Sequence, residues 1–141
     1  MAATFALDIV TPEKTVLSET VTSVQLPAAS GSMGILAGHA PLLAELSVGE
    51  CIVQVADGAE AHFVLAGGFV EVTRERVTIL ADTAERDDEI NVDRAEQSLT
   101  RARELMATIE SGSSAGVSRD DAAEAIRRAQ TRIRIARGGK G

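Results

Sequence analysis

Residues 77–109 of the chain, VTILADTAERDDEINVDRAEQSLTRARELMATI, change from one hydrophobic period to another and so decide the fold. At the start, Val77, Ile79 and Ala81 recur at every second position, which is typical of a half-buried strand. From Asn91 onward the apolar residues recur every three or four positions, as on the buried face of a helix: Val92, Ala95, Leu99, Ala102, Met106 and Ile109. The sequence therefore predicts strands before residue 87 and helices after it.

The first part of the chain repeats the strand pattern several times. Asp57-Gly58, between two alternating runs, predicts a tight hairpin. The spacing of the breaks predicts about eight to ten short strands, and hence an antiparallel β-sandwich or flattened barrel. The alternating runs lie at 5–9, 22–26, 51–55 and 61–65, and the further breaks at 11–13, 30–32, 67–68 and 74–76.

The second part of the chain predicts two helices. Asn91 is placed to cap the first, and Ser118 with Asp121 resembles a capping box for the second. The glycine- and serine-rich residues 111–116 between them predict a short turn, and so an antiparallel helical hairpin. The second stripe is Ala122, Ile126, Ala129, Ile133 and Ala136. The predicted fold is thus a two-part α+β chain, with a β-sandwich over residues 1–86 and a helical hairpin over residues 87–141.

Charge follows the same division. The whole chain of 141 residues has a net charge of −7, which argues against nucleic-acid binding. Residues 1–85 hold 11 acidic and 3 basic side chains, whereas residues 86–141 hold 10 and 11. The last fifteen residues carry six positive charges and no acid. No apolar run is long enough for a membrane span and no signal peptide is evident, so we expect a cytoplasmic protein with no membrane insertion.

The motifs do not predict an enzyme. Residues 112–116 match the G-x-S-x-G nucleophile elbow, but they follow a predicted helix instead of a strand, and no histidine lies downstream. His39 and His62 have no local set of metal ligands, and Cys51 lies in an apolar strand pattern. We therefore expect no catalytic residues and no metal site.

Three segments resemble signature regions of the epsilon subunit of F-type ATP synthase. They are GSMGILAGHAPLL at 31–43, GGFVEV at 67–72 and VTILADTAER at 77–86, and with the hairpin the resemblance covers the whole chain. The resemblance implies a non-catalytic subunit of the central stalk, which couples gamma to the c-ring in proton-driven ATP synthesis. It also implies a peripheral place in the F1 sector, at the cytoplasmic face of the bacterial plasma membrane. The alternative is a stand-alone β-sandwich adaptor with a partner-binding hairpin.

The same resemblance implies surfaces for two rotor partners. The c-ring contact would comprise Ser30, Gly31, Ser32, Met33 and His39. The gamma contact would comprise Gly67, Gly68 and Phe69. As an alternative, the two glycines serve only to shape a bulge in a strand.

The hairpin of this family is a regulator that opposes ATP hydrolysis when it extends along gamma. By resemblance, its basic second helix would contact the α3β3 ring through Arg127, Arg128, Arg132, Arg134 and Arg137. Arginine suits carboxylate partners. The alternatives are a solvated basic face and a hairpin that packs permanently on the sandwich.

Some relatives also bind ATP through an I-D-x-x-R-A motif and further arginines. Here the motif starts Ile90-Asn91 in place of Ile-Asp, so an acceptor oxygen remains but the charge is lost. The resemblance therefore predicts weakened or absent binding of a regulatory ATP, and no other cofactor. The implied site is Glu85, Ile90, Asn91, Arg94, Ala95, Arg101, Arg128 and Arg132.

Overall fold

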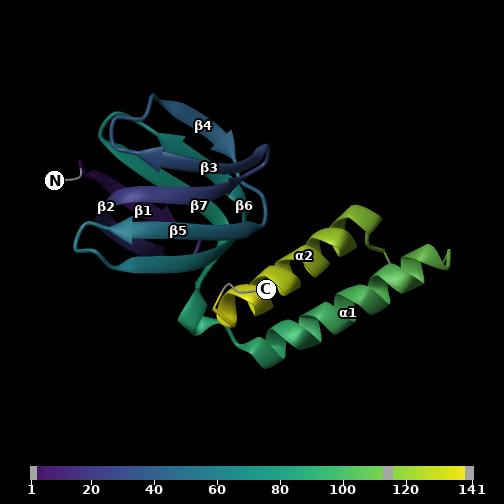
Figure 1. Ribbon diagram of the computed structural model, residues 1–141. Coiled ribbons are helices and arrows are strands. Elements are labelled where there is room, and N and C mark those ends of the chain that lie inside the picture. The colour runs from purple at the N-terminus through teal and green to yellow at the C-terminus, as the bar shows by residue number, and fades with distance from the viewer. Residues whose placement is uncertain (1–2, 113–115, 139–141) are drawn as a thin grey trace. The chain divides into compact units, whose positions relative to one another are not determined.

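The computed structural model describes residues 3–112 and 116–138 (Figure 1). The chain divides into two compact units, residues 1–87 and 88–141, and each is described by itself. Residues 113–115 of the predicted turn, and Gly139 and Lys140 of the basic tail, lie outside the described residues.

The first unit is a β-sandwich of seven strands, which confirms the predicted fold class. Hydrogen bonding runs in the order β1-β7-β6-β5-β2-β3, and β1 also pairs with β2, so that five strands close into a flattened barrel. β4 pairs with β6. The strands are β1 Phe5–Val10, β2 Thr15–Ala28, β3 Gly31–Leu36, β4 Leu42–Glu45, β5 Gly49–Val55, β6 Glu60–Val72 and β7 Arg76–Arg86.

Two details of the sandwich differ from the sequence prediction. The prediction of eight to ten short strands was wrong: the sandwich has seven, and β6 runs through Gly67-Gly68, which had been expected to break it. One pairing, β1 with β7, is parallel, whereas all the other pairings are antiparallel. The Asp57-Gly58 hairpin between β5 and β6 is confirmed, with Gly58 at φ +99°.

β6 continues through Gly67-Gly68 in one register with β7, but its inward-facing side changes there. Phe63 and Leu65 point into the core before the glycines, and Val70 and Val72 after them, an odd spacing. The two glycines have φ of +74° and +109°, which permit this reversal of phase. A Cβ at Gly68 would overlap the carbonyl oxygen of Leu80 on β7, so no side chain fits there. At this level β6 changes its neighbour from β5 to β4.

The second unit is an antiparallel pair of helices, α1 (Val92–Glu110) and α2 (Arg119–Ala136), preceded by the 3-10 turn η1 (Asp87–Glu89). Both predicted caps are confirmed: Arg94 N donates to Asn91 Oδ1, and Asp121 N to Ser118 Oγ, each at 3.0 Å. Both predicted stripes are buried or half-buried. Alanines at the centre of the stripes let the helices approach closely: Ala95, Ala102, Ala122 and Ala129.

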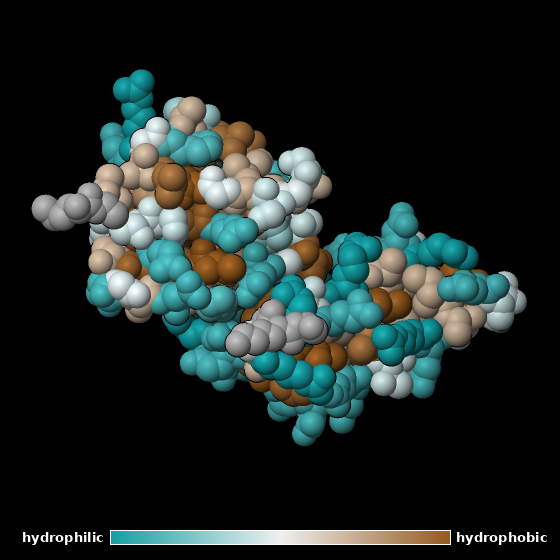
Figure 2. Space-filling model, in the orientation of Figure 1, coloured by the Kyte–Doolittle hydropathy of each residue, from teal (hydrophilic) through white to brown (hydrophobic). Residues whose placement is uncertain are grey.

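The surfaces of the two units differ in kind. In Figure 2, hydrophobic residues form small patches among polar ones on the sandwich, whereas the helical unit is mostly hydrophilic outside the seam between its helices. Neither described helix is long and apolar enough to cross a membrane.

Candidate partner-binding surfaces

Large apolar side chains lie exposed on the outer face of the β4–β6–β7 sheet. Phe69 and Leu80 are direct cross-strand partners, and each is 49% exposed. Leu43 is 69% exposed and pairs with Glu71, two residues beyond Phe69 on the same face of β6. We call Leu43, Phe69 and Leu80 the apolar patch. Adjacent large apolar side chains that are left in water are typical of a surface that binds another protein.

Of the three residues predicted for gamma contact, the structure exposes one. Phe69 belongs to the apolar patch, whereas Gly67 and Gly68 are half-buried and shape β6. Their positive φ and the close approach of β7 give both glycines a structural role, and the β6–β7 register continues past them without a shift, so they do not form a bulge against β7. Leu43 and Leu80 were not predicted from the sequence. In the sequence, each could have been recognised as a leucine at an outward-facing position of an alternating strand.

The predicted c-ring residues lie mainly in the β2–β3 turn and the start of β3. Ser30, Gly31 and Ser32 are exposed, whereas Met33 is half-buried against the core. Gly31 and Ser32 border a hollow of about 270 Å³, where Gln25 Nε2 donates to Ser32 Oγ at 3.1 Å. His39 does not line this hollow. The remaining lining residues are Pro27, Ala28, Ser47, Glu50 and Ile52.

The arginines of α2 do not form a single face. Successive helical residues are about 100° apart, so Arg127 and Arg134 lie on one flank and Arg128 and Arg132 on the other. Arg137 and Arg128 make ion pairs within the helical unit. Arg137 Nη2 lies 2.6 Å from Glu96 Oε1 of α1, and Arg128 Nη1 lies 4.0 Å from Glu124 Oε1. α2 therefore offers positive charge to partners on two sides.

The Arg137–Glu96 pair also links the end of α2 to the start of α1. Glu96 and Thr100 of α1 border one groove of about 600 Å³ together with Arg134 and Arg137 of α2. The arginines predicted for ATP binding do not line this groove, and helical geometry places them on the opposite flank: Arg94 and Arg101 of α1, with Arg128 and Arg132 of α2. The hairpin thus gathers these four arginines on one side.

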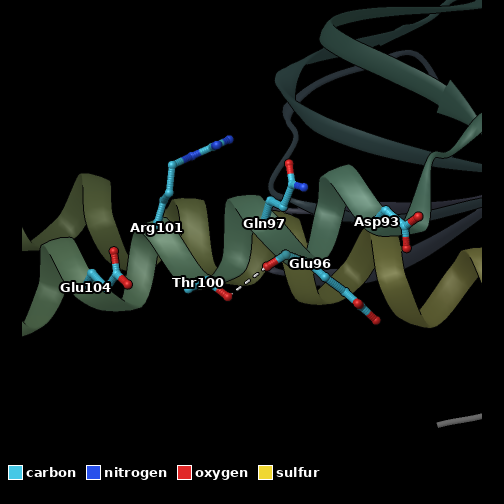
Figure 3. Close-up of a pocket in the computed structure, with 6 residues that line it drawn as sticks. All are labelled: Asp93, Glu96, Gln97, Thr100, Arg101 and Glu104. Atoms are coloured by element: carbon cyan, nitrogen blue, oxygen red, sulfur yellow. Dashed lines mark hydrogen bonds between the residues drawn. The ribbon is translucent and has the colours of Figure 1, made fainter.

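Other members of the predicted ATP site are less available. The side-chain oxygen of Asn91 accepts the capping hydrogen bond from Arg94 N, while Ile90 and Ala95 are buried. Glu85 lies in β7, in the other unit. Figure 3 shows the outer surface of α1, where Arg101 and Gln97 extend from one side of the helix and Glu96 from the other. This recess of about 570 Å³ is also lined by Asp93 and Glu104, so its charge is unsuited to a triphosphate.

A charged cluster that the sequence did not predict lies on the outer face of the β5–β6 hairpin. His62 Nδ1 is 2.8 Å from Glu50 Oε2, and His62 Nε2 is 2.7 Å from Glu60 Oε1. The hydrogen bond to Glu50, supported by that to Glu60, raises the pKa of the His62 imidazole. Hydrogen bonds from His62 and then Gln54 lower the pKa of the Glu60 carboxyl. In the sequence, the cluster could have been recognised from the polar residues at alternate positions of these two strands.

Cys51 lies in the core of the sandwich, as its strand pattern predicted. The residue is fully buried, and desolvation raises the pKa of its thiol. No group of three or more metal-ligating side chains occurs in the described ranges 3–112 and 116–138.

These surfaces are of the kind that binds other proteins, and comparison with known proteins identifies the family. Residues 4–87 match the model of the ATP synthase Delta/Epsilon chain β-sandwich domain. The ATP synthase epsilon chain of Herpetosiphon aurantiacus is 45% identical over 93% of each chain. The sodium-ion-specific epsilon chain of Propionigenium modestum is 40% identical over 95% of this chain and 94% of its own. The chain therefore belongs to the ATP synthase delta/epsilon family, as a non-catalytic subunit of the central stalk.

The fold has a counterpart among solved structures. A chain in the mitochondrial ATP synthase of Euglena gracilis, determined as an OSCP/F1/c-ring assembly, superposes with a TM-score of 0.79. The match covers 93% of this chain and 80% of that one at 24% identity, so the two share the fold of both units despite little sequence in common.

Proposed function

We propose that the β-sandwich joins gamma to the c-ring in the rotor, and that the helical hairpin restrains ATP hydrolysis. Family membership supports a place in the central stalk. The observation that supports the docking role is the apolar patch. Phe69 and Leu80 are exposed at adjacent cross-strand positions, and a bound partner would bury their apolar surface, which is favourable.

The apolar patch is the proposed contact with gamma. Burying the exposed halves of Phe69 and Leu80 contributes about 1–2 kcal/mol each to binding. A polar rim surrounds them, since Glu45 pairs with Phe69 and Glu71 with Leu43. Of the residues suggested by resemblance, Phe69 is assigned to contact gamma, and Gly67 and Gly68 to holding it outward.

The β2–β3 turn is the proposed contact with the c-ring. Ser30, Gly31 and Ser32 present backbone and hydroxyl groups at the surface, beside the hollow that Gln25 and Glu50 also line. Such a polar rim with a shallow hollow suits polar loops of a partner. Half-buried Met33 packs against the core and His39 lies in the loop after β3, so Ser30, Gly31 and Ser32 are the residues proposed to touch the c-ring.

The hairpin is the proposed brake on hydrolysis. Extended toward α3β3, it would offer Arg127 and Arg134 on one flank and Arg128 and Arg132 on the other to carboxylates of the catalytic ring, with Arg137 near the end. The two alanine-rich stripes bury little area, so the helical unit is held by few apolar contacts between its own helices. The assembly so formed would lie in the F1 sector, at the cytoplasmic face of a bacterial plasma membrane, and serve proton-driven synthesis.

A regulatory ATP would bind weakly at the hairpin. Arg101, Arg128 and Arg132 share a flank that suits a polyphosphate. Two features weaken this site. Asn91 has no charge and its side-chain oxygen already accepts the capping hydrogen bond from Arg94 N, and Glu124 partly neutralises the charge of Arg128.

Co-purification tests the docking role. The full-length chain is expected to form a stable complex with gamma, and Phe69→Glu with Leu80→Glu is expected to abolish it. The matched control is Glu19→Gln with Glu75→Gln, which changes exposed carboxylates outside the patch. A stand-alone adaptor would not bind gamma at all. Gamma binding that survives the double glutamate variant would assign the contact elsewhere.

A further inference from the structure

The strongest unexplained feature of the sandwich is His62, which is held between two carboxylates. Its ring nitrogens lie 2.8 Å from Glu50 Oε2 and 2.7 Å from Glu60 Oε1. Ionised carboxylates only accept hydrogen bonds, so both ring nitrogens must donate and the imidazole must carry its second proton. A neutral ring would set a lone pair against one carboxylate. The geometry therefore holds an imidazolium whose proton stabilises the cluster.

The other groups that face His62 within the sandwich are acidic or neutral. On β5, these groups are Glu50 and the uncharged Ile52, which pairs directly with His62. On β6, the charged neighbour is Glu60. The β6–β7 register sets Glu85 opposite Val64, on the same side of β6 as His62, with Asp87 following the strand. Gln25 of β2 pairs with Ile52 and adds no charge. Among the described residues of β5 and β6, His62 is a cation held directly between two carboxylates, Glu50 and Glu60.

The cluster adjoins the turn that was assigned above to the c-ring. Glu50 lines the same hollow as Gly31 and Ser32 and is the charged member of that lining. A partner seated on the turn removes Glu50 from water. Desolvating a carboxylate costs much less when a hydrogen-bonded counter-charge stays beside it than when that charge is lost.

We propose that the protonation of His62 controls how tightly this face of the sandwich docks on the c-ring, so that docking weakens as the pH rises. This inference rests on the proposed c-ring contact and adds its regulation. The sign follows from linkage: docking favours the protonated ring, so affinity is full at low pH and is lost as the pH rises through the pKa of His62. The cluster is a pH-responsive element of the rotor joint.

Binding of the full-length chain to a purified gamma–c-ring rotor, at about pH 6 and about pH 8.5, tests the proposal. Wild type is expected to bind about two- to fivefold more weakly at the higher pH, the range for a partly exposed ion pair. His62→Gln removes the titrating group and is expected to bind weakly at both values. His62→Lys keeps a permanent charge and is expected to bind tightly at both. Glu13→Gln, a carboxylate of the β1–β2 turn, is the control and should follow wild type.

Two results would overturn the inference in distinguishable ways. If wild type and His62→Gln bind the rotor equally well at both pH values, the regulatory role fails and the docking role stands. If no form binds at either pH, the proposed docking function fails together with it. An NMR titration of the His62 ring in the full-length chain provides the second readout: its pKa should exceed that of free histidine and fall toward it in Glu50→Gln.

Discussion

Gly68→Ala is expected to be among the most destabilising single-methyl additions in the sandwich. Gly68 has φ +109°, and an alanine forced into such a conformation costs about 1–2 kcal/mol. The new Cβ would also overlap the Leu80 carbonyl oxygen and lie 2.8 Å from the Ala81 Cα. Relieving that overlap must separate β6 from β7, which adds about 1–3 kcal/mol. The expected total, about 2–5 kcal/mol, is a large part of the stability of a small domain.

Two other glycines separate backbone strain from steric overlap as causes of this loss. Gly58→Ala has a positive φ of +99° but open space around the Cβ, and should lose about 1–2 kcal/mol. Gly34→Ala has neither problem and should be neutral, or more stable by up to about 1 kcal/mol. The assay is urea unfolding followed by the methyl NMR signals of the sandwich core, because the helical unit dominates circular dichroism. A loss at Gly68 no larger than at Gly58 would refute the role assigned to the Leu80 contact.

Three further predictions concern the charged residues. Asn91→Asp keeps the helix cap and restores the missing charge, so calorimetric titration with ATP should show tighter binding than wild type at unchanged helix stability, and unchanged affinity would contradict the site. The pKa of His62 is raised in the folded protein, so the protonated ring stabilises the fold fully below the pKa of the unfolded chain, and this contribution is lost as the pH rises through the folded-state pKa. Wild type should therefore lose stability relative to His62→Gln from about pH 6.5 upward, measured as the midpoint of urea unfolding. Arg137→Gln breaks a surface ion pair with Glu96 and should cost at most about 1 kcal/mol in thermal unfolding of the helices, and a larger loss would show that the pair does more than link them.

The sandwich was predictable wherever alternation is regular and unpredictable where its phase changes. Leu7 and Ile9 are buried as the pattern of β1 indicates. In β2 the pattern placed Thr22 in line with Val24, but Val21 is the buried residue, because a bulge in the β2–β5 pairing shifts the phase between Val21 and Ser23. A bulge depends on contacts with a strand distant in sequence, which a local pattern does not contain.

The helices followed the sequence more closely than the strands did. Capping by Asn91 and Ser118 is local, so residue type and spacing were sufficient to find both starts. Ile135 is an exception: it is buried, yet it lies outside the predicted stripe, which was counted along one face of α2.

The candidate surfaces were predicted only in part. Resemblance suggested Phe69, but the neighbours that make it a patch, Leu43 and Leu80, become adjacent only through the strand pairings. The His62 cluster likewise joins Glu50 of β5 to β6. Pairing register brings such residues together, and it is set by the whole fold.

The most direct test of the account is the rate of ATP hydrolysis by the assembled enzyme. Removing residues 127–141 should raise this rate, and so should the triple variant Arg127→Gln, Arg128→Gln and Arg134→Gln, which keeps the Arg137–Glu96 pair intact. A matched variant, Arg103→Gln with Arg119→Gln, changes exposed arginines elsewhere on the hairpin and should leave the rate unchanged. Equal hydrolysis by the full-length, truncated and triple-variant enzymes would contradict a regulatory role for the basic helix.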